Sequence, residues 1–301
     1  MSEFSKIGLV GRPGHPGVVA SLGRLLAHLA EKDVEVILDQ VIANLLPDNG
    51  HQVMSREELC RLCDLIVVVG GDGSMLNVAQ LIASEHVPVI GVNRGRLGFL
   101  TDIRPDDIEI RMDQVLGGDY TVESRFLLDL VARREGKTIP LGCALNDVVL
   151  HPGRAAQMIE FELFVNGSFV NSQESDGLIV ATPTGSTAYA LSAGGPIMHP
   201  GLNAIVLVPM YPHTLSSRPI VVDGDSEIRM VVRHKHSIQP QLSCDGQVKF
   251  TVIPGDEILV KKKAVQLQLI HPPDHSFYNA CRSKLGWGSR LAVDDQERES
   301  E

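Results

Sequence analysis

The stretch from Leu65 to Ala79, LIVVVGGDGSMLNVA, decides the fold expected of the first half of the chain. Its first five residues are apolar and mostly β-branched, which is typical of a strand buried on both faces of a parallel sheet. Gly70-Gly71-Asp72-Gly73 then interrupts the apolar run, and Ser74 is a candidate cap for the helix that follows. A strand, a glycine turn and a helix start together bring a phosphate group close to backbone N–H groups in α/β proteins.

The unusual feature of this turn is the acid among its glycines. A carboxylate repels phosphate, so Asp72 is expected to contact a metal ion or a hydroxyl group instead. The combination predicts phosphoryl transfer to an alcohol. The sequence has no G-x-x-x-x-G-K-[ST] motif to supply a lysine for the phosphates. A divalent cation, Mg²⁺, is therefore expected to arrive with the nucleotide rather than in a cage of protein ligands.

The length and composition limit the remaining possibilities. A chain of 301 residues, 44% hydrophobic and 21% charged, can build two domains with substantial cores. Its formal net charge of −10 argues against nucleic-acid binding. No apolar run approaches the roughly 20 residues of a membrane-spanning helix, and the first residues, MSEFSK, do not have the pattern of a signal peptide. We therefore expect a cytoplasmic protein with no membrane or nucleic-acid partner.

The cysteines do not suggest a disulfide framework, because there are five of them and they are scattered. Cys60-x-x-Cys63 has the spacing of a zinc or redox motif but lacks a second pair. Its surroundings, EELCRLCDL, have a helical pattern. We interpret the pair as two thiols on one helix.

The first half of the chain alternates strand and helix patterns. Besides the central strand, it contains strand patterns at 6–10, 35–38 and 87–92. Val18–Glu31 has its leucines on one helical face. This repetition predicts a doubly wound parallel sheet that binds ligands beyond the carboxyl ends of its strands. The loop Asn93–Thr101, with Arg94 and Arg96, either shares a crevice with Asp72 or is an ordinary solvated loop.

From Phe126 onward, short alternating strand patterns follow one another at close spacing, the last two of them separate runs at 256–262 and 265–271. Asn166-Gly167, between two apolar runs, is a strong signal for a hairpin turn. We expect this half to be a β-sandwich-like domain, and the helix-compatible stretch Phe277–Arg290 to return to the first domain. The expected organisation is an α/β domain at 1–125 that also includes 275–292, a β domain at 126–274, and a disordered acidic tail at 293–301.

Two polar stretches interrupt the β patterns. Asn146-Asp147 separates two apolar runs and is either a strand-end turn or a polar site. From Asp176 to Pro196, a strand leads into a run of Gly, Ser, Thr, Ala and Pro. Small residues let a ligand approach the backbone, their hydroxyl and amide groups offer hydrogen bonds, and Tyr189 offers a flat face for an aromatic ring. We interpret this second stretch as a ligand site.

Together these segments resemble the bacterial NAD kinases, which phosphorylate the 2′-hydroxyl of the adenosine ribose of NAD. GGDG alone also occurs in diacylglycerol-type and sphingosine-type lipid kinases and in phosphofructokinases. The ordered set of motifs is far more specific. It comprises GGDG at 70–73, the loop 93–100, LNDVV at 145–149, D-G-x-x-x-x-T-P-T-G-S-T-A-Y from Asp176 and Ser243-Cys244-Asp245.

The resemblance implies the fold expected above and a role for individual residues. Asp72 would activate the ribose hydroxyl as a general base, and Gly73 would present its backbone to the ligand. The rest of the implied NAD site comes from the second half of the chain. It consists of Asn146 and Thr187 around adenine, Asp147 on the ribose hydroxyls, Asp176 with Ala188 and Tyr189 at the nicotinamide end, and Ala190, Leu191, Ser192 and Gln247 in the remaining pocket wall.

Gln157, Glu174 and Asp245 are further candidates for ligand contact. Many family members have glutamate at the position of Asp147, and some have arginine and histidine at those of Glu174 and Gln157. The shorter side chain of Asp147 bears on its reach to the ribose, and the departures at Glu174 and Gln157 bear on the preference between NAD and NADH and on inhibition by the reduced product. The resemblance also implies ATP, or another phosphoryl donor such as polyphosphate, and a homo-oligomer, a tetramer or a dimer, in which Gln247 serves a neighbouring chain.

Two other functions use parts of the same pattern. A lipid or sphingoid-base kinase would share GGDG but would need an apolar acceptor tunnel, whereas the stretch around Thr184 and Thr187 is polar. A non-catalytic dinucleotide sensor would bind NAD without turnover, but such a protein has no need of Asp72 in its phosphate turn.

Overall fold

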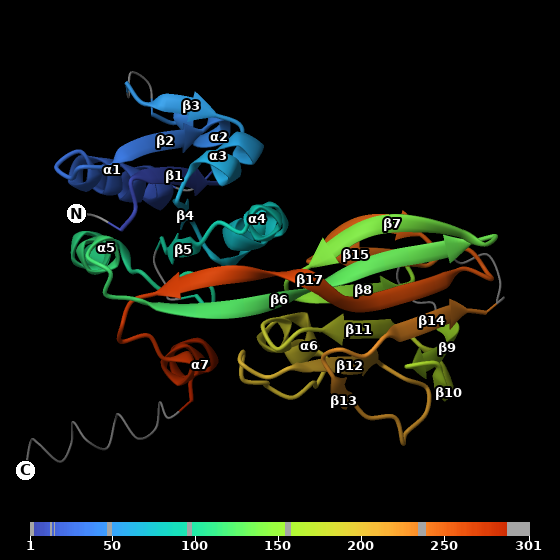
Figure 1. Cartoon of the computed structure of the whole chain (residues 1–301). Coiled ribbons are helices and arrows are strands. Elements are labelled where there is room, and N and C mark those ends of the chain that lie inside the picture. Colours follow the sequence, from blue (N-terminus) through green and yellow to red (C-terminus); the bar gives the residue numbers. More distant parts are fainter. Residues whose placement is uncertain are drawn as a thin grey trace, which may run out of the picture. The chain divides into compact units, whose positions relative to one another are not determined.

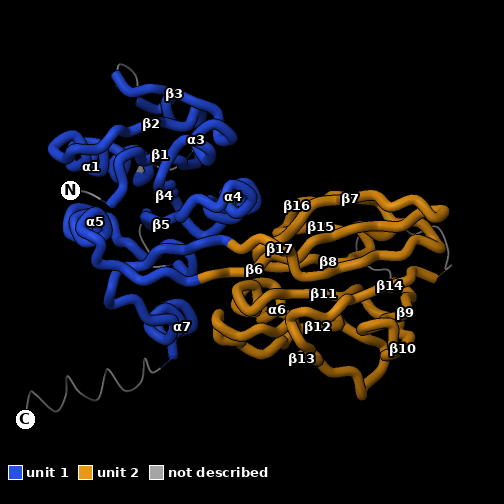
Figure 2. Tube along the Cα trace, in the orientation of Figure 1, with its two compact units in different colours: residues 1–123, 267–301 blue, residues 124–266 orange. Residues whose placement is uncertain are grey.

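The computed structural model describes residues 3–12, 14, 16–46, 50–94, 98–153, 158–233 and 239–287. The acidic tail and Gln157 lie outside these residues. The chain forms two compact units (Figure 2), one comprising residues 1–123 and 267–301 and the other residues 124–266. Two strands, β6 (Thr121–Arg134) and β17 (Glu257–His271), carry the chain out of unit 1 and back into it.

Unit 1 is built on a parallel sheet with the strand order β17-β5-β4-β1-β2-β3 (Figure 1). Besides β17, the sheet contains β1 (Lys6–Gly11), β2 (Glu35–Asp39), β3 (Gln52–Met54), β4 (Leu65–Val69) and β5 (Val89–Val92). All five residues of β4 are fully buried, as expected for an apolar strand covered on both faces.

Helices cover both faces of this sheet. The helices are α1 (Pro16–Leu29), α2 (Gln40–Ala43), α3 (Arg56–Leu62), α4 (Asp72–Glu85), η1 (Pro105–Asp107), α5 (Ile108–Leu116) and α7 (Phe277–Leu285). On one face, α1 and α5 share a core with alternate strand residues such as Ile7 and Leu9. On the other, Gly8 lies against Leu59 and Cys63 of the α3 region. This arrangement confirms the predicted doubly wound sheet.

Unit 2 is mostly β. One sheet has the order β13-β12-β11-β8-β15-β16, and the other contains β10-β9-β14-β17 with β6 and β7. The bounds are β7 Lys137–Ala144, β8 Asp147–His151, β9 Ile159–Val165, β10 Ser168–Ser175, β11 Gly177–Ala181, β12 Ala204–Met210, β13 Ile220–Asp223, β14 Ile228–Val232, β15 Gln241–Cys244 and β16 Gln247–Thr251, with the short helices η2 (Gly185–Thr187) and α6 (Tyr189–Ser192).

The two sheets of unit 2 share one core. It includes Val148 and Val180 from the first sheet and Phe161 and Met230 from the second. Asn166 and Gly167 join β9 to β10 with φ values of 51° and 77°, the backbone of a type I′ hairpin turn. The predicted β-sandwich-like domain and its hairpin are therefore confirmed.

Two local expectations were wrong. Ser74 does not cap α4: the helix begins at Asp72 with Gly71 as the N-cap, and no side chain caps it. The runs at 256–262 and 265–271 are one strand, β17, because the intervening lysines are tolerated on partly exposed positions. The interpretation of the cysteine pair is confirmed. Cys60 lies in α3 and Cys63 ends it, both are buried free thiols, and burial raises their pKa values to about 12 and about 11.

Candidate active site

In unit 1, the carboxylate of Asp72 is held by the loop that follows β5. Oδ2 accepts a hydrogen bond of 3.0 Å from the backbone N–H of Phe99, and Oδ1 accepts bonds of 3.1 Å from the N–H of Leu100 and 3.2 Å from Oγ1 of Thr101. A carboxylate offers about four acceptor positions. These three bonds fix the side chain and leave room for about one further donor.

The loop is shaped to receive this carboxylate. Gly98 is buried, and a Cβ at this position would overlap Oδ1 of Asp72. Thr101 is held in turn by Asn93, whose Nδ2 donates to Oγ1 of Thr101 at 2.9 Å. The part of this loop that the structure describes from Gly98 onward therefore contacts Asp72. This favours a crevice shared with Asp72 over an ordinary solvated loop. Arg94 is exposed, and Arg96 lies outside the described residues.

Gly73 is the second residue of α4 and is exposed. A Cβ at Gly73 would meet no atom within 4 Å among the described residues. Ser74 and Met75 donate their backbone N–H groups to the carbonyl of Gly71, and this end of a helix favours negative charge. Asp72 and Gly73 thus combine a fixed carboxylate with an open stretch of backbone.

In unit 2, Asn146 and Asp147 stand at the start of β8, where the neighbouring strands β11 and β15 end. The loop before β8 is held by Asp245, whose carboxylate accepts hydrogen bonds of 2.9, 2.8 and 3.2 Å from the N–H groups of Leu145, Asn146 and Asp147. Asp245 reaches them from the turn between β15 and β16, with a φ of 48°. Its place in the structure is therefore that of an anchor for the Asn146-Asp147 pair.

Two buried carboxylates, those of Asp147 and Asp245, lie at this end of the sheet. Asp147 is 5% exposed, and burial, followed by the nearby charge of Asp245, raises its pKa to about 7. Burial also raises the pKa of Asp245, although the three backbone N–H donors oppose the change. A partner that donates hydrogen bonds to Asp147 would relieve the cost of this buried charge.

The segment after β11 packs directly on Asn146. The N–H of Thr182 donates to the carbonyl of Asn146 at 2.9 Å, and Oγ1 of Thr182 donates to the carbonyl of Leu145 at 2.6 Å. A Cβ on Gly185 would overlap the backbone of Asn146. Thr187 ends η2 with its Oγ1 bonded to the carbonyl of Thr184. Asn146 and Thr187, predicted to lie around adenine, thus belong to one hydrogen-bonded corner.

The chain enters this corner from Asp176 along β11 and leaves it through α6. Ala190 of α6 is buried against the core beneath, Ala188 and Leu191 are half-buried, and Tyr189 is 51% exposed. Ser192 lines a pocket of about 250 Å³ together with Met210, whose carbonyl accepts the N–H of Asp176 at 2.9 Å. Asp176 itself is half-buried. The small-residue segment therefore extends from the Asn146 end of the sheet to the Asp176 end.

Two remaining candidates lie outside this arrangement. Gln247 is exposed at the start of β16, and its Oε1 accepts a hydrogen bond from Nζ of Lys249 at 3.0 Å. Glu174 lies in β10, where its carbonyl accepts the N–H of His213.

The sequence reasoning missed Gly98 and the backbone donors of Phe99 and Leu100. The only signal for them was the position of their loop at the end of a buried strand.

Comparison with known proteins agrees with this geometry. Residues 7–120 match the ATP-NAD kinase N-terminal domain, and residues 145–272 match the ATP-NAD kinase C-terminal domain. The NAD kinase of Azotobacter vinelandii is 62% identical over 291 residues, which is 97% of this chain and 99% of the relative.

Two solved structures are also similar. Yeast NADH kinase complexed with NADH has a TM-score of 0.86 and 26% identity, covering 95% of this chain and 88% of that one. An NAD kinase from Archaeoglobus fulgidus in complex with ATP has a TM-score of 0.70 and 27% identity, covering 89% and 94%. With both halves matched and a near full-length relative at this identity, the chain belongs to the ATP-NAD kinase family.

Proposed function

We propose that the chain transfers a phosphoryl group from ATP to the 2′-hydroxyl of the adenosine ribose of NAD, with Asp72 as the general base. As a member of the NAD kinase family the chain is a phosphotransferase. The observation that carries the role of Asp72 is its carboxylate, fixed by three donors with about one acceptor position left. A ribose hydroxyl in that position would be oriented and would lose its proton to Asp72 as the phosphoryl group arrives.

The NAD site proposed for unit 2 follows the corner at Asn146. Asn146 and Thr187 would surround adenine, and Asp147 would accept hydrogen bonds from the ribose hydroxyls. Asp176, Ala188 and Tyr189 would hold the nicotinamide end, with Ala190, Leu191, Ser192 and Gln247 in the remaining wall. The half-exposed ring of Tyr189 supports a stacking role, because a buried ring would have no face free for a ligand.

Mg²⁺ would enter as part of the MgATP substrate. Mg²⁺ prefers several oxygen ligands in octahedral geometry. Within the described residues the single group of three or more potential metal ligands contains two histidines and does not include Asp72. The donors around Asp72 therefore do not fit a dedicated magnesium cage. Loss of turnover in excess EDTA, restored by Mg²⁺, is expected, and full activity in EDTA would contradict this part of the proposal.

We also propose a homo-oligomer, a dimer or a tetramer, in the cytoplasm. Unit 2 exposes large apolar side chains that an interface would cover, among them Tyr211 and Leu215 at 81% and 94% exposure and Val221 of β13. Light scattering that gave the mass of one chain at assay concentration would contradict the oligomer. Within the described part of the chain, no helix is long and apolar enough to span a membrane.

The test of the proposed function is formation of NADP from NAD and ATP by the purified chain, detected by coupled reduction of the product. Resonances of the adenosine ribose would identify the 2′-position as the site of phosphorylation. A radiolabelled phosphate that ended on a lipid extract would favour a lipid kinase instead. Tight NAD binding without turnover would favour a sensor.

A further inference from the structure

His271, the last residue of β17, lies between two carboxylates from other parts of unit 1. Its Nδ1 is 2.8 Å from Oδ2 of Asp102, and its Nε2 is 3.6 Å from Oε2 of Glu123 in β6. The side chain of His271 is 0% exposed. A neutral ring would present a lone pair to one of the two carboxylates, whereas a ring protonated on both nitrogens presents an N–H to each. The geometry therefore indicates an imidazolium.

His275 completes the surroundings of this ring. Its imidazole stacks on that of His271 with the centroids 3.7 Å apart and 19° between the planes. Its Nδ1 lies 2.8 Å from the same Oδ2 of Asp102. Two stacked cations at this distance would repel each other, so His275 donates to Asp102 as a neutral ring.

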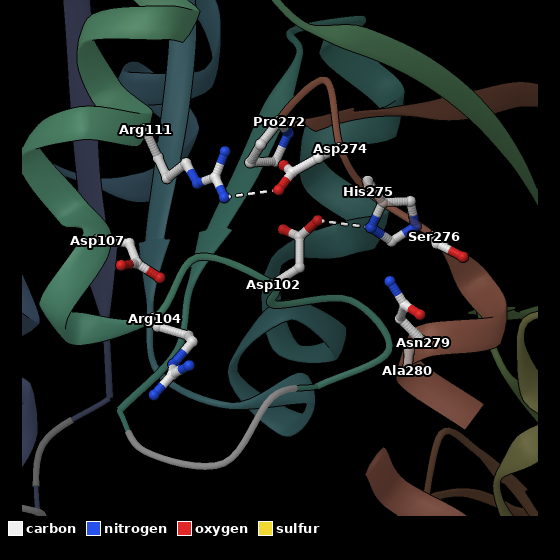
Figure 3. A pocket seen from close by; sticks show the side chains of 10 residues that line it. All are labelled: Asp102, Arg104, Asp107, Arg111, Pro272, Asp274, His275, Ser276, Asn279 and Ala280. Carbon is white, nitrogen blue, oxygen red and sulfur yellow. Dashed lines mark hydrogen bonds and ion pairs between the residues drawn. The ribbon is translucent and has the colours of Figure 1, made fainter. Parts of the chain in front are cut away.

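Asp102 and His275 also line a pocket of about 330 Å³ in unit 1. Figure 3 shows the two side chains directed at each other on its wall. The charged residues on the rest of that wall are two arginines and two aspartates: Arg104, Asp107, Arg111 and Asp274. Because their formal charges cancel, the carboxylates of Asp102 and Glu123 dominate the field at His271.

The pKa values agree with a charged pair. Burial lowers the pKa of His271, but the hydrogen bonds with Asp102 and Glu123 outweigh burial and raise it above its ordinary value of 6.5. Burial raises the pKa of Asp102, but the hydrogen bonds from His271 and His275 outweigh burial and hold it at about 2. Asp102 is therefore ionised at neutral pH, and His271 keeps its proton to a higher pH than an exposed histidine does.

The contact between Asp102 and His271 is one residue away from the proposed catalytic carboxylate. Thr101 donates to Oδ1 of Asp72 at 3.2 Å, and two backbone N–H groups of the same loop donate to that carboxylate as well. Asp102 is the next residue of the chain. The ring of His271 thus attaches the loop at 98–102 to the end of β17, and a shift of this ring would reach Asp72 through Thr101.

We propose that His271, as an imidazolium held between Asp102 and Glu123, is a positioning residue for Asp72. The inference rests on the proposed role of Asp72 as the general base. Loss of the proton from the buried Nε2 would leave a lone pair facing Glu123, so the ring and the attached loop would lose their fixed position. The stabilisation from this proton is fully present below pH 6.5 and is lost as the pH rises through the raised pKa of His271.

Glu123→Gln tests the proposal with a result that a merely structural role would not give. The amide of Gln can accept a hydrogen bond from a charged ring or donate one to Nε2 of a neutral ring, so the attachment persists in both forms. Between pH 6.5 and pH 9 the wild-type kcat should therefore fall about tenfold relative to that of the variant. KM for NAD should stay the same, because the groups proposed to hold NAD lie in unit 2.

Two further variants complete this experiment. His271→Asn removes the charge and should lower kcat about tenfold already at pH 6.5, with a pH profile that then follows Glu123→Gln. Asp113→Asn is the matched control, because Asp113 lies 2.9 Å from Nε2 of His28 in a second histidine–carboxylate pair, which joins α1 to α5. This control should keep the wild-type pH profile. Coincident profiles for the wild type and Glu123→Gln would overturn the proposal.

Hydrogen exchange of the segment 98–102 measures the same coupling without turnover. At pH 9 the amides of Phe99 and Leu100 should exchange about tenfold faster in the wild type than in Glu123→Gln, and at pH 6.5 equally fast. If the wild type forms no NADP but this difference is present, the proposed function has failed and the attachment of the loop by His271 stands. Equal exchange at both pH values would overturn the attachment.

The charge of His271 can be measured in the wild type itself. Nitrogen-15 NMR of the labelled histidines at pH 7 should show a ring with both nitrogens protonated, and its signals should be missing in His271→Asn. A wild-type spectrum in which every histidine ring is neutral at pH 7 would overturn the proposal, and that result does not require any variant to fold.

Discussion

Oδ2 of Asp72 accepts the backbone N–H of Phe99 at 3.0 Å, so the proposed general base is also the anchor of the loop after β5. The two functions share one carboxylate. A substitution at Asp72 therefore changes charge and loop attachment together, and the experiments below separate the two effects.

Replacing Asp72 with Asn should lower kcat by about 10²–10⁴, the usual contribution of general base catalysis. NAD should still bind within several-fold of the wild-type affinity, because the groups proposed to hold it lie in unit 2. The amide of Asn also places an NH₂ group against a backbone N–H of Phe99 or Leu100, so some loss of loop order is expected too. Steady-state kinetics and NAD binding measure the two quantities. A variant that keeps more than a tenth of the wild-type kcat would exclude Asp72 as the base.

Thr101→Val is the control for loop attachment. It removes one donor to Asp72 and the Oγ1 acceptor of Asn93, and it leaves the carboxylate in place, which should cost about 1–2 kcal/mol of stability and less than tenfold in kcat. A fall in kcat as large as that of Asp72→Asn would mean that anchoring explains the whole effect. Recovery of the Asn variant in excess Mg²⁺ would instead identify Asp72 as a metal ligand.

Gly98→Ala should lower kcat by at least tenfold without a change of any proposed catalytic group. The new Cβ would overlap Oδ1 of Asp72, and a displacement of about 1 Å at a reacting group can cost 10²-fold. The matched control is Gly23→Ala, an exposed position in α1 where a Cβ meets nothing within 4 Å of the described residues. That variant should gain about 0.5–1 kcal/mol of stability and keep its activity. Unchanged kcat in Gly98→Ala would show that the carboxylate position is not critical.

Asp147→Asn should stabilise the ligand-free chain more at pH 8 than at pH 5. The folded pKa of about 7 lies above the ordinary value of 3.8, so between these values the folded chain holds a proton that the unfolded chain has released. The stabilisation from this proton is present at low pH and is lost as the pH rises through 7. The wild type should therefore lose about 2–3 kcal/mol relative to the variant between pH 5 and pH 8. Urea unfolding of the wild type and the variant at the two pH values measures this change.

Tyr189→Ala should weaken NAD binding by about 1–3 kcal/mol, the usual value for stacking of a base on an aromatic ring. Tyr189 is 51% exposed, so the thermal midpoint should change little. Comparing KM for NAD with Tm separates stacking from a core role. A clear loss of Tm with an unchanged KM would contradict the stacking role. Tyr278→Ala, at 56% exposure in α7 of unit 1, is the control.

The parts of the fold that follow from local patterns were predictable. β4 matches the apolar run 65–69 residue for residue, and the β9–β10 turn matches Asn166-Gly167, because burial on both faces and a left-handed turn each leave a clear mark on the sequence. The start of α4 was not predictable in the same way. Asp72 can begin the helix because its side chain bonds to a distant loop rather than to its own helix.

The supports of the site depend on contacts between distant residues. Asp245 holds Leu145 and Asn146 across about a hundred positions of sequence, and His271 reaches Asp102 across 169. Periodicity and spacing carry no information at that range. Sequence therefore indicated the polar residues that a ligand would touch, whereas their anchors became visible only in three dimensions.

The return of β17 to unit 1 also sets an order of events during synthesis. β5 pairs with β4 on one side and, through Val89, with Leu269 of β17 on the other. Ile103 pairs with the Val92 end of that edge, but the Val89 end lacks its β17 partner until the ribosome has extended the chain from Val92 to Leu269. At about 5–20 residues per second the delay is roughly 9–35 s. Unit 2, which carries the proposed NAD site, is one contiguous segment and is complete before unit 1, so the unit that carries Asp72 is the last to close.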